Sequence, residues 1–354
     1  MSDRTGASFG FVLAGVAAAT TFGSWPTERP RTVAFGAAAV ATVAFFVARR
    51  DLLDRRLTSP PAALGSVGII TGGLGGIAAG GDVFVPSLTA ALGVLACAAA
   101  WADLRAIPSD RLLSQVRLAM TGAAVGIAGI ASIFIFGALL LSLVAGSDAE
   151  SVSPLIEATL STLALGIGTI TVAGAYIALS DLDRSYVDAR LPTRREWGYV
   201  VGGTVLLLVS NLAISALFGW LGVESTTHSL IRAAQEDPEI LLALVPLSYL
   251  VVGPGEELLY RNVIQKSLRA EFSAVGGIAV ASVVFAAVHL PAYADPNGTA
   301  LALLNTLAIV FVLSLILGAV YERTSNLTVS ALVHGSFNAV GYAVAYADIA
   351  GLFG

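Results

Sequence analysis

About eleven apolar runs follow one another along this chain, and they constrain its fold more than any other feature. A helix needs about 20 mostly apolar residues to cross the hydrocarbon core of a bilayer, which is ~30 Å thick. Most of the runs approach that length, although some are short. The sequence therefore predicts an all-α, polytopic transmembrane helical bundle of about eleven spans. The expected spans are residues 8–25, 33–48, 63–81, 83–101, 118–145, 154–180, 198–221, 240–252, 274–290, 300–321 and 327–346.

Composition supports the membrane assignment and excludes several other classes of protein. Only 12% of the residues are charged and 56% are hydrophobic, whereas soluble domains carry about 25% charged residues. The single cysteine, Cys97, excludes an intramolecular disulfide and a cysteine-based metal site. The basic residues are scattered among loops and form no stripe, so we expect no nucleic-acid partner. The expected partner is the lipid bilayer, and the expected location is the cell membrane, with multiple passes.

The positions of the basic residues predict the orientation of the chain. Cytoplasmic loops of membrane proteins are enriched in Lys and Arg. With a cytoplasmic N-terminus and eleven spans, only Arg29, Arg31 and Arg232 of the 19 basic residues fall outside. The opposite orientation would reverse this bias. We therefore predict that the N-terminus is cytoplasmic and the C-terminus is outside.

A polar loop at residues 102–117 divides the chain into two expected domains. Residues 1–117 form an N-terminal four-span membrane region whose role the sequence does not indicate. Residues 118–354 form a second helical domain, and its polar intramembrane residues fall within 253–340.

The most informative of these polar stretches is residues 253–262, GPGEELLYRN. Ionisable side chains inside a membrane are costly, and they usually mark function. Glu257 and Arg261 are four residues apart and share a helix face, so they can form an ion pair. Glu256 lies about 100° away around the helix and is free to handle protons. The short run 240–252 reaches spanning length only if its helix continues through this stretch.

Two of the three histidines also fall inside apolar runs. His289 lies four residues after Phe285, and His334 lies four residues before Asn338, so each pair shares a helix face. A turn centred on Ser273 would return His289 to the depth of Glu257. We therefore expect the glutamates and both histidines to meet in the cytoplasmic half of the membrane. His228, in an amphipathic outer segment at 224–239, is assigned no role.

This set of side chains is suited to hydrolysis. Glu256 would act as a general base on a water that His289 helps to hold, and His334 and Asn338 would donate hydrogen bonds to the developing oxyanion. In a second version, Glu256, His289 and His334 would bind zinc, as in a His₂Glu catalytic site. The residues leave both versions open, so zinc is a candidate cofactor and no cofactor is certain.

Three motifs in order carry a resemblance to a known family. EELLYR (256–261), FAAVH (285–289) and HGSFN (334–338) are similar to the EExxxR, FxxxH and HxxxN motifs of the CPBP family. That family groups CAAX prenyl endopeptidases with bacteriocin-processing and immunity proteins. The resemblance implies an intramembrane endopeptidase whose cavity faces the cytoplasm. It assigns catalytic roles to Glu256, Glu257, Arg261, His289, His334 and Asn338.

The resemblance also limits what can be said of the substrate. Only part of the family cleaves after a prenylated cysteine, so the implied substrate is a membrane-associated peptide or protein, lipidated in some members. Two other classes would use the same buried polar residues. One is a non-enzymatic membrane immunity or binding protein, and the other is a transporter that lines an ion pathway with them.

Overall fold

The computed structural model describes residues 3–80, 83–145, 152–295 and 297–352. Within these residues the chain is helical and contains no strand. Gly81, the last residue of the expected third span, lies outside the described residues. The predicted all-α class is confirmed.

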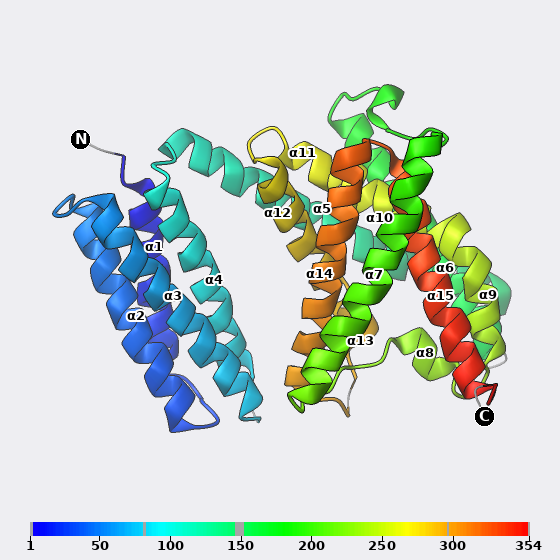
Figure 1. Cartoon of the computed structure of the whole chain (residues 1–354), viewed down its shortest axis with the longest axis horizontal. Coiled ribbons are helices and arrows are strands. Elements are labelled where there is room, and N and C mark those ends of the chain that lie inside the picture. The colour runs from blue at the N-terminus through cyan, green and yellow to red at the C-terminus, as the bar shows by residue number, and fades with distance from the viewer. Residues whose placement is uncertain (1–2, 81–82, 146–151, 296, 353–354) are drawn as a thin grey trace. The chain divides into compact units, whose positions relative to one another are not determined.

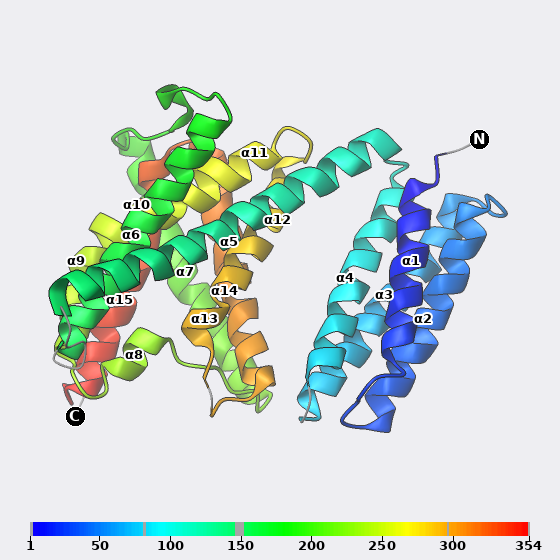
Figure 2. The same cartoon turned by 180° about the vertical axis from the view of Figure 1, so that it is seen from behind.

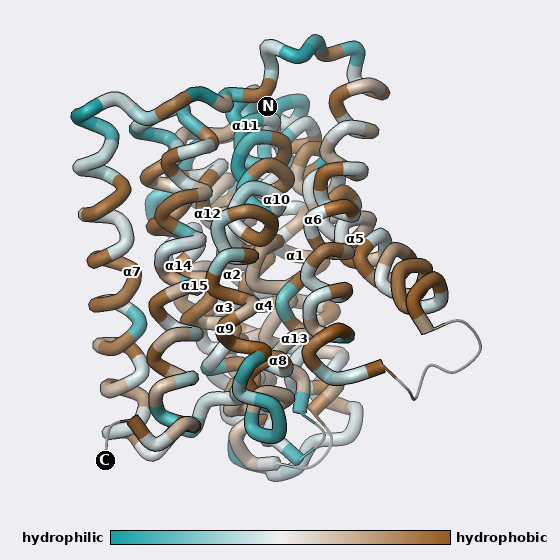
Figure 3. The backbone as a smooth tube through the Cα atoms, turned by 90° about the vertical axis from the view of Figure 1, so that its right-hand side faces the viewer, coloured by the Kyte–Doolittle hydropathy of each residue, from teal (hydrophilic) through white to brown (hydrophobic). Residues whose placement is uncertain are grey.

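Eight helices of the described chain are long and apolar enough to cross a membrane, so this is a multi-pass membrane protein. Figure 3 shows hydrophobic residues along the middles of the helices and hydrophilic residues mainly at their ends and in loops. The eight are α2 (Glu28–Arg49), α3 (Arg55–Ala78), α4 (Phe84–Leu104), α5 (Ser109–Ala145), α6 (Pro154–Leu179), α7 (Arg194–Trp220), the helix Glu239–Leu268, and α14 (Ala300–Thr324).

Three further helices occupy expected spans but are not among these eight. The apolar helices α1 (Thr5–Thr20) and α12 (Ala274–Val288) have 16 and 15 residues, which is short for a ~30 Å core. Helix α15 (Leu327–Ile349) has 23 residues and carries His334 and Asn338.

The chain forms two compact units, one of residues 1–116 with 299–301 and the other of residues 117–298 with 302–354. The first unit contains α1 to α4 (Figure 1). Small residues bring these helices close together, as the glycine-rich sequence predicts. A Cβ on Gly72 would lie 2.7 Å from the backbone nitrogen of Ala34, and one on Gly73 would lie 2.7 Å from that of Ala90.

The second unit is built around the helix Glu239–Leu268, which runs without a break through the Glu-Glu stretch. It consists of α9 (Glu239–Leu247), the π-helix η3 (Ser248–Val252), α10 (Gly253–Glu257), the π-helix η4 (Leu258–Gln265) and α11 (Lys266–Leu268). The prediction that run 240–252 continues through the glutamates is confirmed. Two π segments are unusual in one helix, and π-bulges are frequent at functional sites.

Glycines let this helix lie against its neighbours at backbone distance. A Cβ on Gly253 would be 2.5 Å from the carbonyl oxygen of Ala331 on α15. A Cβ on Gly255 would be 2.6 Å from the hydroxyl of Thr169 on α6. The two glutamates follow directly, so the glycines bring them close to α15 and α6.

Helix α5 is inclined to the other helices of the second unit (Figure 2). Its buried residues are three glycines, Gly122, Gly126 and Gly129, which recur at helical spacing on one face. These positions face Ile264, Val284 and Leu259. Helix α5 therefore packs on the π-helix η4 and on α12 through a narrow seam.

Loop 180–193 closes one end of the second unit. It contains the short helix η2 (Arg184–Tyr186). The amide N–H of Asp188 donates to the side chain of Asn262 at 2.8 Å, and the Asp188 carboxylate accepts from Lys266 at 2.8 Å and from Tyr321 at 2.6 Å. We call this end the arginine-rich end, because its loops and helix termini carry Arg184, Arg190, Arg194, Arg195, Lys266, Arg269 and Arg323.

We predict that Gly253→Ala destabilises the protein by about 1–3 kcal/mol, because the added methyl group overpacks the contact with Ala331. The matched control is Gly202→Ala on α7, where a Cβ would meet no atom within 4 Å. It should be neutral or stabilising by up to about 1 kcal/mol, because alanine favours helix. Thermal unfolding in detergent measures both, and equal stability of the two variants would contradict the close packing.

Candidate active site

The two adjacent glutamates of α10 lie in different environments. Glu257 has no exposed surface, whereas Glu256 is 7% exposed. The Glu257 carboxylate is 3.3 Å from Nε of Arg261, in an ion pair that is buried on both sides. The predicted pairing of Glu257 with Arg261 is confirmed.

Arg261 and Glu257 are also held from other helices. Arg261 Nη2 donates to the hydroxyl of Ser314 on α14 at 2.9 Å. The other oxygen of Glu257 accepts from Nδ1 of His334 on α15 at 3.1 Å. Buried charges need polar partners inside the protein. These contacts supply partners from two more elements, and Nη1 of Arg261 makes no hydrogen bond.

Glu256 faces the two histidines and makes no hydrogen bond to the protein through Oε2. That oxygen lies 4.0 Å from Nε2 of His289 and 3.7 Å from Nε2 of His334. These separations are too long for direct hydrogen bonds and short enough for one water to contact both partners. The sequence expectation that three separate helices bring these groups together holds, with Glu256 as the glutamate nearest to His289.

The contact made by Nδ1 of His289 determines which nitrogen of the neutral ring carries the hydrogen. Nδ1 lies 2.7 Å from the carbonyl oxygen of Phe285, which can only accept, so Nδ1–H donates. In the neutral ring, Nε2 is then a hydrogen-bond acceptor. His289 therefore presents a lone pair toward the space beside Glu256.

Phe285 lies at the centre of the site, and the sequence analysis did not count it among the candidate residues. Its ring centroid is 4.3 Å from that of His289 and 6.0 Å from that of His334. The guanidinium carbon of Arg261 lies 5.0 Å from the same centroid, within cation–π range. The fixed spacing of Phe285 to His289 in the motif was the available signal for this role.

Asn338 is the candidate residue with the weakest connection to the others. It lies one helical turn after His334 on α15 and is partly exposed. Within the described residues, no hydrogen bond joins its side-chain amide to another group of the site. Its predicted role at the oxyanion remains a prediction.

The zinc version of the site can be tested against the positions of its three ligands. Neutral His289 offers a lone pair, and carboxylate and imidazole are ligand types that zinc accepts. However, no group of three or more His, Cys, Asp or Glu in the described part of the chain is arranged to hold a metal ion. We therefore derive no step through a metal.

A cavity of about 270 Å³ adjoins Glu256 and His289. Most of its other lining residues come from α5, α6, the helix α8 (Ser229–Ala233) and the helix α13 (Leu290–Tyr293). Helices α8 and α13 lie at the end of the unit opposite the arginine-rich end (Figure 1). The cavity therefore lies at the end of the unit away from the arginine-rich end, and the expectation that it faces the cytoplasm stays a prediction. His289 follows the last residue of α12, so it lies about 22 Å from the start of that helix and reaches the far half of the unit.

His228 lines this cavity, although the sequence analysis assigned it no role. Its Nδ1 accepts from the amide N–H of Leu230 and so caps α8. Its ring packs edge-on against Tyr293, with centroids 5.0 Å apart. Burial, together with the nearby His289 and Arg232, lowers the pKa of His228 to about 4. No motif marks this residue, so only the folded chain could reveal it.

We predict that His228→Asn reduces the loss of stability in acid. The pKa of His228 is about 4 when folded and about 6.5 when unfolded, so the unfolded chain gains a proton between these values. The stability that the neutral ring contributes is full above about pH 6.5 and is lost as the pH falls toward 4. From about pH 7 to about pH 5 the loss is about 2 kcal/mol.

Asparagine retains a capping acceptor and does not titrate. Thermal unfolding in detergent at both pH values should therefore show a larger drop for the native chain than for the variant. Equal losses of stability in the two proteins would contradict the lowered pKa of His228.

The helices that carry these site residues also match a known protein family. Residues 238–340 match the family model described as Rce1-like, type II CAAX prenyl endopeptidase. The matched segment is under a third of the chain and contains all six candidate residues. Comparisons with curated proteins and with solved structures find no match. The resemblance carried by the three motifs is confirmed: residues 238–340 are similar to the Rce1-like type II CAAX prenyl endopeptidase family.

Proposed function

We propose that this protein is an intramembrane endopeptidase of the cell membrane that hydrolyses a peptide bond in a membrane-associated peptide or protein. The observation that carries the proposal is the free oxygen of Glu256. It is buried, makes no hydrogen bond to the protein, and lies within about one water's reach of two imidazole nitrogens. An unpaired buried carboxylate oxygen is costly, so a water or substrate atom is its natural partner.

In the proposed reaction, Glu256 acts as the general base. A water between Glu256 and His289 would donate one hydrogen to the carboxylate and one to Nε2 of His289. Glu256 would take a proton as the water oxygen attacks the peptide carbonyl. The proton would then pass to the leaving amine, which completes the hydrolysis.

Glu257 and Arg261 would act by positioning His334. The Glu257 carboxylate accepts from Nδ1 of His334 and holds the ring in place. The charges of Glu256, Glu257 and Arg261 sum to −1, and a protonated His334 would bring the cluster to neutrality. Its Nε2–H could then donate to the oxyanion of the tetrahedral intermediate, together with Asn338 from the next turn of α15.

We predict that Glu256→Gln lowers the rate of peptide cleavage by about 10²–10⁴-fold, because a carboxamide cannot accept the proton. The control is Glu28→Gln, at a surface position of α2 where the side chain is 75% exposed, and it should cleave at the native rate. Purified proteins and a set of apolar peptides provide the assay. Native-rate cleavage by Glu256→Gln would refute this mechanism.

We predict that a metal chelator leaves the cleavage rate unchanged, because no step requires a metal ion. The measurement pairs the cleavage assay with an elemental analysis of the purified protein. Loss of cleavage with chelator, recovery with zinc, and one zinc ion per chain would instead establish the His₂Glu version of the site. A Glu256→Ala protein that then loses its zinc would assign that residue as a ligand.

A further inference from the structure

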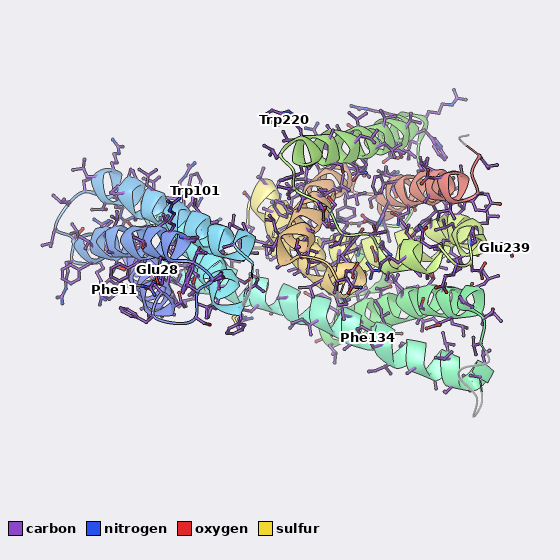
Figure 4. The ribbon with its side chains drawn as sticks, turned by 90° about the horizontal axis from the view of Figure 1, so that it is seen from below. Phe11, Glu28, Trp101, Phe134, Trp220 and Glu239 are labelled. Atoms are coloured by element: carbon purple, nitrogen blue, oxygen red, sulfur yellow. The ribbon has the colours of Figure 1, made fainter. Side chains whose placement is uncertain are left out.

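Helix α7 packs on the rest of the second unit through one face only. It lies at the edge of that unit, with α14 and α15 on one side of it and Trp220 at its end (Figure 4). Its buried residues are Glu196, Val200, Gly203 and Leu207, which recur at helical spacing on a single face. Most of its other residues are exposed, so in a membrane they contact lipid or a bound ligand.

A groove of about 620 Å³ runs between α7 and α14. Its α7 wall contains Gly198 and Gly202, and a Cβ on either glycine would meet no atom within 4 Å. No other described residue therefore fills the space beside these glycines. Apart from Tyr199 and Arg323, the lining residues are apolar or glycine. Ligand sites in proteins have volumes of ~300–1,000 Å³ and mostly apolar walls, and this groove has both properties.

The length of the groove matches one layer of lipid acyl chains. Its lining runs from Gly198 to Leu206 on α7 and from Val312 to Arg323 on α14. At ~1.5 Å per residue, these stretches are ~12 Å and ~16 Å long. One half of the hydrocarbon core of a bilayer is ~15 Å thick. The groove can therefore hold an acyl chain along its whole length.

Two arginines flank the groove at the arginine-rich end of the unit. Arg323 lines the groove near the end of α14 and is exposed. Arg195 is also exposed, and it lies three residues before Gly198 on the same face of α7. Arg190, which precedes α7, donates to the carbonyl oxygen of Thr324 at 3.3 Å. The start of α7 and the end of α14 are thus joined, so both arginines lie at one end of the groove.

These two arginines have no anionic partner within the described chain. No hydrogen bond or ion pair joins the side chain of Arg195 or Arg323 to another described residue. The acidic residues that adjoin them in the sequence are already paired, Glu196 with Arg190 and Glu322 with Arg269. The groove therefore has an apolar length and a cationic end whose charge the protein leaves open to an external anion.

We propose that this groove binds one anionic phospholipid, with an acyl chain between α7 and α14 and the headgroup phosphate at Arg195 and Arg323. Basic pockets between transmembrane helices bind anionic headgroups, and the guanidinium group suits phosphate. The hydroxyl of Tyr199, which also lines the groove, is a further donor. A zwitterionic lipid binds less well, because its headgroup brings a cation to the two arginines. The lipid site is independent of the proposed proteolysis.

A second copy of the chain is a poorer occupant of the groove. Gly198 and Gly202 are four residues apart, a spacing that also occurs where transmembrane helices associate. In a two-fold symmetric dimer each residue near the axis meets its own copy. A parallel contact through α7 would therefore place Arg195 of the two chains together, and this like-charge contact has no anion to relieve it.

Lipid titrations followed by native mass spectrometry test the site. The full-length protein, purified in detergent, is titrated with phosphatidylglycerol or with phosphatidylcholine that has the same acyl chains. The expected result is one tightly bound phosphatidylglycerol per chain and weaker binding of phosphatidylcholine. Equal affinity for the two lipids overturns the proposal. Binding of inorganic phosphate with the affinity of phosphatidylglycerol would show a site for free phosphate and also overturns it.

Removal of the two charges tests the headgroup contact. The double variant Arg195→Gln, Arg323→Gln should bind phosphatidylglycerol about 30-fold more weakly, since each arginine near a headgroup contributes about a factor of five. Its affinity for phosphatidylcholine should not fall. The control removes two other exposed arginines, Arg29→Gln and Arg117→Gln, and should bind phosphatidylglycerol as the native chain does. Equal loss in the control, or no loss in the double variant, overturns the assignment of the headgroup.

Filling the groove tests where the acyl chain lies. Gly202→Leu places a side chain in the groove at a position with no atom within 4 Å of a Cβ, so the protein should fold and lose the bound phosphatidylglycerol. The matched control is Gly219→Leu, which is equally open and lies outside the groove, and it should bind the lipid normally. Unchanged binding by Gly202→Leu overturns the proposal. A native dimer that Gly202→Leu converts to a monomer also overturns it, because a second copy then occupies the groove.

Discussion

The ion pair between Glu257 and Arg261 is the interaction on which the second unit depends. Both side chains are fully buried, and removing ions from water costs several kcal/mol for each. This cost is offset only if every charge finds partners inside the protein. Ser314 on α14 and His334 on α15 supply two of them, and Phe285 on α12 supplies its ring face to Arg261. One buried pair therefore fixes three neighbouring helices around α10 and η4.

The same requirement explains the backbone of the central helix. A charged pair can be satisfied from several helices only if those helices come close. Gly253 and Gly255 allow this, because a Cβ at either position would collide with α15 or α6. The two π segments, one on each side of α10, widen the helix next to the glutamates. The geometry of the site thus depends on two glycines and two π segments that take no part in the proposed reaction.

The ion pair between Glu257 and Arg261 also gives the two glutamates different roles. Glu257 is held by Arg261 and His334, while Glu256 keeps an oxygen that makes no hydrogen bond to the protein. His289 and His334 approach that oxygen from two helices. The proposed hydrolysis needs one carboxylate that is hydrogen-bonded to the protein and one with a free oxygen. The first, on Glu257, holds His334 in position, and the second, on Glu256, accepts a proton. The cavity beside the second carboxylate leads away from the arginine-rich end.

The sequence alone determined the helical membrane class, the i,i+4 pairing of Glu257 with Arg261 and the family resemblance of residues 238–340, because length, hydropathy, helical spacing and short motifs are local properties. Local spacing also predicted that His289 and His334 would approach the glutamates. It could not show that Phe285 lies between the imidazoles and Arg261, nor that His228 joins the cavity wall, since neither contact follows from a motif. The direction of the cavity was decided only by tertiary structure. Which end of a bundle is closed depends on how loop 180–193 packs on η4, α14 and α15, and contacts between residues so distant in sequence leave no local pattern.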